Sequence, residues 1–296
     1  MNPGLPYAVL AFVAWGLYPL YFLMIASVPP LEVVLQRSVW SLVVVLGLLA
    51  VLRRWDWLRP LLAQPRRLGP FAVSALLLSL NWLVYVLAVQ TGHVIEASLG
   101  YFINPLVNVL LGVLVLRERL RRVQWVAVAL AAAGVLWLTL LTGRLPWIAL
   151  TLACTFGLYG LMRKTASLGA LEGLALETML LAPVMIPALA WWTFAHQGVL
   201  VQGDVSQIGW ILLSGPLTAV PLLLFAAGAR RMPLATLGLV QYLAPTIQLL
   251  LGVWVFHEPF DSQRLVGFVF IWSALAIVSA DALGLRRLRP APVPPP

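Results

Sequence analysis

Long apolar runs separated by short polar segments dominate the chain. A helix that spans a bilayer needs roughly 20 mostly apolar residues. Runs of this kind predict spans at 5–26, 31–52, 69–90, 94–116, 123–142, 146–162, 171–195, 206–229, 233–256 and 265–283. The runs do not alternate apolar and polar positions as the strands of a membrane β-barrel do. The pattern therefore predicts an all-α polytopic membrane protein with ten transmembrane helices.

The first run, 5–26, also raises the question of a secretory signal. No Lys or Arg precedes it, it has the length of a full span, and further spans follow. We therefore expect a helix that is retained in the protein. The connections between the runs are short and rich in Pro, Gly and Arg, so we expect no soluble domain in any of them.

Composition and charge narrow the class of protein. Hydrophobic residues make up 62% of the chain and charged residues 10%, whereas a soluble domain is roughly a quarter charged. This composition excludes a soluble globular enzyme. The net charge is +9, but the Lys and Arg residues cluster in alternate loops, and only Arg37, Arg144 and Arg264 fall elsewhere. The positive-inside rule then places both termini in the cytoplasm, so the basic loops indicate topology and not a nucleic-acid partner.

An internal repeat relates the two halves of the chain. A shift of 140 residues aligns 101–118 with 241–258 without a gap, and Pro, Leu-Leu-Gly-Val and Glu coincide. Because each half holds five spans, an odd number, the second half must enter the membrane from the opposite face. Inverted repeats are a common build of secondary transporters, with the substrate near the midplane between them. We therefore predict two inverted five-helix repeats, 1–143 and 144–284, and a disordered cytoplasmic tail at 285–296.

One segment also carries a resemblance to a known family. Residues 96–112 read Glu-Ala-Ser-Leu-Gly-Tyr-Phe-Ile-Asn-Pro-Leu-Val-Asn-Val-Leu-Leu-Gly. With Trp-Gly-Leu-Tyr-Pro-Leu-Tyr at 15–21 and Asn81-Trp82, this segment resembles the RarD branch of the EamA-type drug/metabolite transporter superfamily, over about residues 4–284. The resemblance implies a ten-helix permease or exporter of the bacterial inner membrane with both termini inside. Members are described as chloramphenicol-sensitivity permeases or amino-acid exporters, which does not settle the cargo.

Arg37 lies about six residues into the second predicted span. An arginine at a helix centre costs roughly 2.5–3.5 kcal/mol on insertion scales, so it needs an explanation. It could anchor a carboxylate or another polar group of a substrate. It could equally form an internal ion pair or extend its side chain to the outer surface. Glu177 matches Arg37 across the repeat, which makes an ion pair between the halves conceivable.

Asn81, Tyr85, Tyr101, Asn104 and Asn108 form the richest polar and aromatic cluster. The last three are three and four residues apart, so they share one helix face. We prefer the interpretation that this face lines a cavity. The alternative is that the asparagines tie helices together with hydrogen bonds worth about 0.6 kcal/mol each.

Prolines and aromatic residues support a cavity near the midplane. Pro105 removes a backbone donor, so we expect a kink in the fourth span, and Pro245 predicts the same in the ninth. Trp15 and Tyr18 lie in mid-span and suit a small amphiphilic cargo, and Tyr159 is the repeat partner of Tyr18. Taken singly, each of these aromatic residues is better explained by plain packing. The predicted substrate-binding residues are Trp15, Tyr18, Arg37, Asn81, Tyr85, Tyr101, Asn104, Asn108, Tyr159 and Gln241.

Four carboxylates have separate interpretations. Glu96, near the outer end of the fourth span, and Glu177 are the candidates for proton coupling. The alternative interpretation of Glu96 is a structural carboxylate that the helix dipole stabilises at a helix N-terminus. Glu118 and Glu258 end matching helices, and we interpret both as caps of the turns that follow them.

Enzymatic chemistry finds little support. His257-Glu258 begins like a zinc-protease H-E-x-x-H motif, but position 261 is Asp261. We find neither a nucleophilic set of residues nor a Walker motif, and we expect no metal and no cofactor.

Three function classes remain. We favour a secondary transporter, an exporter of small metabolites such as amino acids or amphiphilic drugs, because inverted repeats suit alternating access. A lipid or polyprenyl-carrier flippase is the alternative, and an intramembrane enzyme is less favoured because a catalytic site needs no such symmetry. The expected partners are a small-molecule substrate and the lipid bilayer, and we expect a monomer or a weak homodimer.

Overall fold

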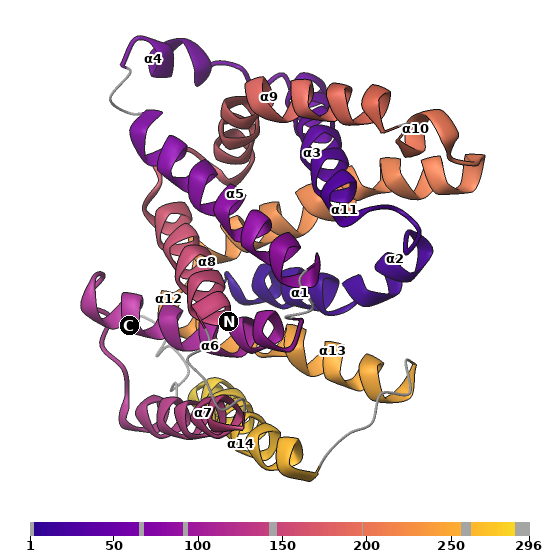
Figure 1. Ribbon diagram of the computed structural model, residues 1–296. Coiled ribbons are helices and arrows are strands. Elements are labelled where there is room, and N and C mark those ends of the chain that lie inside the picture. Colours follow the sequence, from indigo (N-terminus) through magenta and orange to yellow (C-terminus); the bar gives the residue numbers. More distant parts are fainter. Residues whose placement is uncertain are drawn as a thin grey trace.

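The computed structural model describes residues 3–64, 68–90, 94–141, 147–196, 198–255 and 262–287. All regular structure within these ranges is helical (Figure 1). The helices are α1 (Leu5–Gly16), α2 (Tyr18–Met24), α3 (Pro30–Leu52), α4 (Leu58–Leu62), α5 (Gly69–Gln90), α6 (Val94–Leu114), α7 (Arg122–Leu140), α8 (Trp147–Thr165), α9 (Ala170–Ala195), α10 (Val199–Gln202), α11 (Val205–Ala229), α12 (Leu234–Gln241), α13 (Leu243–Trp254) and α14 (Ser262–Arg287).

Several of these helices can cross a membrane. Five segments are long and apolar enough by length and composition, namely Leu5–Met24, Pro30–Leu52, Arg122–Leu140, Ala170–Ala195 and Val205–Ala229. Shorter apolar helices lie at Gly69–Tyr85, Gly100–Leu114 and Leu265–Ile277. Each predicted span overlaps one helix or two consecutive helices. The predicted class, an all-α polytopic membrane protein, is confirmed.

Two of the predicted spans are interrupted. The first changes from α1 to α2 at Leu17, and the ninth changes from α12 to α13 at Tyr242. Pro19 follows the first break, and because proline has no N–H it leaves the Trp15 carbonyl without its helical donor. Gln248 Nε2 of α13 donates to that carbonyl at 3.0 Å. The two broken helices therefore stabilise each other at the interruption.

The two prolines at matching positions behave differently. Pro245 lies three residues after the break between α12 and α13, whereas α6 stays helical through Pro105. A Cβ on Gly238 of α12 would lie 2.6 Å from the Pro105 carbonyl oxygen, so the two helices approach closely there. This packing accompanies an uninterrupted fourth span, while the ninth span is interrupted close to its proline.

Helix contacts recur between the two halves. Helix α5 packs on α8 as α11 packs on α1, and α6 packs on α8 as α13 packs on α1. The glycines at these contacts also correspond. A Cβ on Gly16 would come within 2.8 Å of Ile247, and one on Gly157 within 2.6 Å of Val107. Val107 and Ile247 are 140 residues apart, the shift that aligns the repeat.

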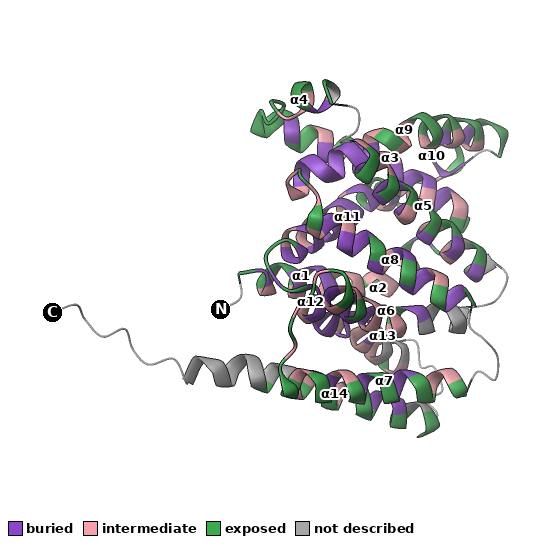
Figure 2. Ribbon diagram, turned by 90° about the vertical axis from the view of Figure 1, so that its left-hand side faces the viewer, coloured by how far each residue is buried: buried purple, intermediate pink, exposed green. Residues whose placement is uncertain are grey.

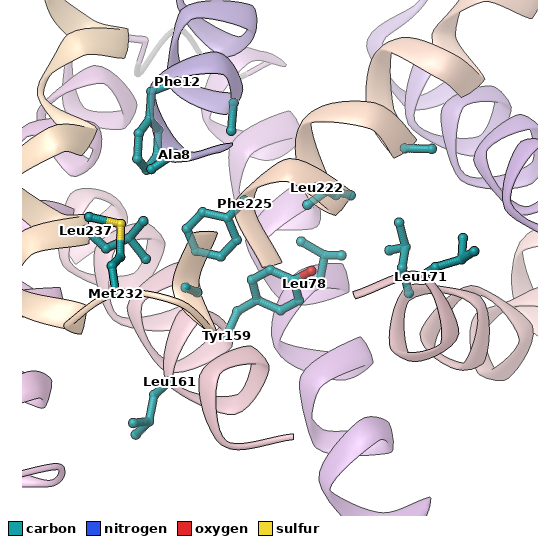
Figure 3. Packing of buried hydrophobic residues seen from close by; sticks show 14 of the residues in the cluster. Ala8, Phe12, Leu78, Tyr159, Leu161, Leu171, Leu222, Phe225, Met232 and Leu237 are labelled. Carbon is teal, nitrogen blue, oxygen red and sulfur yellow. The ribbon is translucent and has the colours of Figure 1, made fainter. Parts of the chain in front are cut away.

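The interior and the periphery are clearly separated. Helices α7 and α14 pack side by side at one edge of the molecule (Figure 1). Buried positions concentrate on α8, α11 and α12, whereas many exposed positions lie on peripheral helices such as α7 and α14 (Figure 2). The largest apolar cluster packs residues of α1, α8 and α11 together, with Tyr159 beside Phe225 and Leu78 (Figure 3). This cluster supports one wall of the site described next.

Candidate functional site

A cavity of about 380 Å³ lies between helices of both halves. This volume falls within the range of small-molecule sites. Its wall is mostly aromatic and apolar and includes Phe12, Trp15, Tyr18, Phe22, Trp82, Tyr85, Tyr101 and Phe156. Its polar side chains, besides the tyrosines, are Arg37, Asn81, Gln241 and Gln248. The mixture suits a cargo with an apolar body and a polar or charged group.

The cavity is displaced toward one face of the bundle. Its lining residues come from the middle of each helix or from the half that lies away from the arginine-rich loops. On the side of those loops, apolar side chains such as Ala8, Leu161 and Met232 belong to the large cluster (Figure 3). The cavity therefore lies between the centre of the bundle and the face opposite the basic loops.

Arg37 projects from α3 into this wall. Its Nε donates to Thr218 Oγ1 of α11 at 3.1 Å. Its Cζ lies 4.9 Å from the centroid of the Trp82 ring and 5.7 Å from that of Tyr18. Among the side chains that the structure describes, no carboxylate lies within ion-pair distance of Arg37. A hydrogen bond and ring contacts hold the guanidinium, and no described carboxylate balances its charge.

The structure does not form the ion pair between Arg37 and Glu177 that the repeat makes conceivable. Glu177 Oε1 instead accepts from Arg163 Nη1 at 3.3 Å and from the hydroxyl of Ser74. Arg163 was expected in a cytoplasmic loop, but α8 continues to Thr165 and buries it completely. Its Nη2 also donates to the Gly169 and Ala170 carbonyls, at 3.3 and 2.9 Å. Glu177 faces α8 and α5, so it has no access to Arg37.

Seven predicted site residues meet in the cavity wall. They are Trp15, Tyr18, Arg37, Asn81, Tyr85, Tyr101 and Gln241. Asn81 also reaches α8, since its Nδ2 donates to the Leu152 carbonyl at 3.0 Å and to Thr155 Oγ1 at 2.9 Å. The rings of Tyr85 and Tyr101 lie edge to face at 6.1 Å. The structure therefore assembles most of the predicted set around one space.

Three predicted site residues lie outside that wall. Asn108 Nδ2 donates to Asn104 Oδ1 at 3.2 Å and to Gln241 Oε1 at 2.7 Å, and both asparagines are buried. They join α6 to α12, while Tyr101 on the same helix lines the cavity. Tyr159 is fully buried and stacks on Phe225 within the apolar cluster. The expected common face of Tyr101 and the two asparagines is thus divided between the cavity and a helix contact.

The predicted cap at Glu118 has a different partner from the one expected. Its Oε1 accepts from Leu234 N at 2.8 Å and its Oε2 from Ala235 N at 3.0 Å, so it caps α12 in the other half. Lys164 Nζ lies 3.7 Å from Glu118 Oε1. A Cβ on Gly112 would lie 2.6 Å from Glu118 Oε2, which explains a glycine in the repeated Leu-Leu-Gly-Val segment. Free N–H groups at the first turn of a helix attract such a carboxylate.

Two other predicted carboxylates have side chains outside the described part of the structure. Glu96 lies in the first turn of α6, and its side chain is outside the described part of the structure. Glu258, with His257 and Asp261, is outside the described residues. Among the residues that are described, no group of three or more His, Cys, Asp or Glu side chains could hold a metal ion.

Sequence reasoning missed several contributors to the site, Phe22 and Trp82 among them. Phe12, Phe156 and Gln248 line the cavity, and Thr218 holds Arg37. Gln248 is the repeat partner of Asn108, so the 140-residue shift could have identified it. Thr218 lies in an apolar run with no sequence signal of its own, because its role depends on which helix faces Arg37.

Comparisons with known proteins agree with this architecture. The EamA-like transporter family matches residues 2–140 and again residues 145–280. The chain is 48% identical to an uncharacterized transporter of Pseudomonas aeruginosa, over 97% of each chain. It is 47% identical to the protein RarD of Streptomyces exfoliatus, over 96% of this chain and 90% of that one. A solved crystal structure with 18% sequence identity has a TM-score of 0.68 and covers 95% of this chain and 98% of its own, which shows the shared fold. The chain therefore belongs to the EamA-like transporter family, in its RarD branch.

Proposed function

We propose that this protein is a secondary transporter that exports small metabolites, such as amino acids or amphiphilic drugs, across the bacterial inner membrane. The observation that carries the proposal is the cavity of about 380 Å³, to which both halves contribute wall residues. An interrupted helix from each half contributes to its wall, as in transporters whose substrate sites lie between repeats. The family relationship supports transport, and the cavity supports a small cargo.

A contact on the side of the basic loops supports alternating access. Glu118 follows α6 in the first half and caps α12 in the second. Lys164 Nζ donates to the Met232 and Ala229 carbonyls at 2.6 and 3.3 Å, next to the same cap. These contacts hold the start of α12 in place on the side of the cavity that faces the basic loops. We propose that they hold this side closed and separate when the cavity opens to the cytoplasm.

Counterflow in proteoliposomes tests the proposed function. A variant with Cys154→Ser removes the single cysteine, and Phe22→Cys then places a thiol in the cavity wall. A bulky thiol reagent should block counterflow of accepted amino acids or chloramphenicol in this variant. The matched control is Leu136→Cys on α7, which is 58% exposed and remote from the cavity. Counterflow that survives modification at position 22 would overturn a route through this cavity.

The proposed closure has its own test. Ala8 is fully buried below the cavity, so Ala8→Cys should label slowly from the cytoplasmic side. Adding Glu118→Gln weakens the cap on α12 and should speed that labelling. Unchanged labelling would show that Glu118 only shapes the helix end.

The oligomeric state, for which we propose a monomer or a weak homodimer, can be measured on the same purified protein by light scattering.

Proton coupling is proposed at a carboxylate, with Glu96 and Glu177 as the candidates. Glu177 is engaged with Arg163 and Ser74, which gives it a structural role in this state. Glu96 is the better target for a first test. Glu96→Gln should abolish uptake driven by a proton gradient while counterflow continues, and an unchanged gradient response would exclude it.

A further inference from the structure

Arg37 differs from the other cations held inside the bundle. Arg163 and Lys164 each have a carboxylate within 4 Å, Glu177 and Glu118 respectively. Among the described side chains Arg37 has none, although it is half-buried in a wall rich in aromatic rings. A buried charge is normally paired or hydrogen-bonded, because desolvation is costly. The missing anion at Arg37 is therefore a property of the site that needs an explanation.

The nearest acid on the same helix is engaged elsewhere. Glu32 lies five residues before Arg37 and is buried. Its Oε1 accepts from Val199 N at 2.7 Å, and its Oε2 accepts from Trp192 Nε1 at 3.2 Å. Gln36 Nε2 lies 3.5 Å from Glu32 Oε1 and completes this group. Glu32 thus holds the segment around α10 in place and is not the ion-pair partner of Arg37.

The orientation of the guanidinium suits a bidentate ligand. Its Nε donates a hydrogen bond to Thr218 Oγ1, and its Cζ lies over the Trp82 ring. Within the described part of the chain, its two terminal nitrogens have no hydrogen-bond partner. Those nitrogens carry four donors in a fixed plane, which matches the two oxygens of a carboxylate. The side chain is therefore fixed at one edge and open at the other.

Thr218 is well placed to fix that edge. It is 2% exposed on α11, in the second half, whereas Arg37 belongs to the first half. The neighbouring Leu217 carbonyl accepts from the hydroxyl of Tyr18, whose ring also contacts the guanidinium. The hydrogen bond therefore joins α3 to α11 across the two halves, and the guanidinium has a defined plane only while this contact exists.

We propose that Arg37 forms an anion subsite for the carboxylate of a monocarboxylate cargo, and that Thr218 is its positioning residue. This inference rests on the proposed transport through the cavity and adds the charge class of the cargo. The described wall holds one cation and no Asp or Glu, so an ammonium group on the cargo would find no carboxylate among these side chains. Phe12, Trp15 and Phe156 offer an aromatic surface to the rest of the molecule. An aromatic or alkyl monocarboxylate fits this wall better than the corresponding amine.

Four probes with the same aromatic body separate the charge classes. They are 3-phenylpropionate, phenylalanine, 3-phenylpropanamide and phenethylamine, which carry an anion, a zwitterion, no charge and a cation. Binding to the purified full-length chain in nanodiscs can be followed by tryptophan fluorescence, because Trp15 and Trp82 line the cavity. We expect 3-phenylpropionate to bind about tenfold more tightly than its amide, since hydrogen bonds to charged groups are stronger than neutral ones. Phenylalanine should fall between the anion and phenethylamine.

Variants then assign the roles of the two residues. Arg37→Gln should abolish the preference for the acid over the amide. Thr218→Val should reduce it several-fold while binding of the amide stays unchanged, and Thr218→Ser, which keeps the hydroxyl, should restore it. Thr178→Val is the matched control, because the buried Thr178 hydroxyl donates to the Leu174 and Ala175 carbonyls of its own helix. This variant should leave the preference intact.

The outcomes are distinguishable from failure of the proposed function. Equal affinity for all four probes, or no binding of any of them, would overturn the anion subsite even if counterflow of another cargo succeeds. Equal losses of acid and amide in Thr218→Val would show a structural role and overturn the assignment of Thr218. Acid-selective binding without counterflow would support the subsite and count against transport.

Discussion

Two arginines inside the helical bundle show how the same side chain serves two purposes. Arg163 is completely buried, with Glu177 3.3 Å from its Nη1 and two backbone carbonyls that accept from its Nη2. Arg37 is half-buried, with a threonine hydroxyl and two aromatic rings as its described contacts. A fixed carboxylate next to a buried cation completes a structural contact, whereas a cation without one keeps its charge available to a ligand.

Their positions along the helices explain the difference. Arg163 lies in the last turn of α8, where carbonyl groups lack helical donors and the helix dipole favours a positive charge. Arg37 lies within α3, where the backbone of its own helix is already satisfied. Its hydrogen bond must therefore come from a neighbouring helix or from a bound molecule. The two arginines should therefore differ in how much stability is lost when each is replaced.

Arg163→Met should destabilise the protein most. It leaves the buried Glu177 carboxylate without its cation, and breaking a buried ion pair typically costs about 3–5 kcal/mol. Thermal unfolding of the purified protein in detergent measures the loss. The double variant Arg163→Met with Glu177→Leu removes both charges and should recover much of the stability. If Arg163→Met alone were as stable as wild type, the ion pair of Arg163 would not distinguish it from Arg37 in its effect on stability.

Glu177→Gln should have an intermediate effect. The amide oxygen still accepts from Arg163 and Ser74, but the charge of Arg163 is no longer balanced, so we expect a loss of about 1–3 kcal/mol. Glu172→Gln is the matched control. Its partner Arg54 is 59% exposed, and pairs of this kind are worth about 0–1 kcal/mol. An equal loss in both variants would show that burial does not decide the strength of these pairs.

The sequence predicted the helical spans and much of the cavity, for a physical reason. Apolar length locates spans, and the repeat locates matching helices, so residues such as Trp15 and Tyr101 were identified. Helices that are apolar on every side carry no pattern that tells which face meets which neighbour. For this reason the positions of Asn104 and Asn108 against α12, and the role of Thr218 beside Arg37, could be recognised only in three dimensions.

The predicted boundary between the sixth span and the loop after it was also wrong. Arg163 ends an apolar run, so hydropathy assigned it to a cytoplasmic loop, yet it is more deeply buried than Arg37. Its partner Glu177 is 14 residues away on the following helix, and nothing in the spacing indicates that they meet. Likewise Glu118 was assigned to its own turn, because a cap on a helix 116 residues further along has no local signal.

Asn104→Leu should cost little stability. It removes the oxygen that accepts from Asn108 Nδ2, one hydrogen bond at the contact of α6 with α12. Hydrogen bonds between membrane helices average about 0.6 kcal/mol, and Asn108 keeps its bond to Gln241. Counterflow should fall only in proportion to the folded protein that is lost. Complete loss of counterflow at unchanged thermal stability would instead assign Asn104 to the substrate.

Arg37→Gln should change stability least, although it should alter cargo selection most. The variant gives up one hydrogen bond between α3 and α11, worth about 0.6 kcal/mol, but it also removes a charge that is costly to keep in the membrane. It leaves none of the described carboxylates unpaired, and the freed Thr218 hydroxyl can turn to a carbonyl of its own helix, as that of Thr178 does. We therefore expect thermal unfolding within experimental error of wild type. A loss comparable to that of Arg163→Met would mean that Arg37 is held by the structure for its own stability, and the two arginines would then serve one purpose.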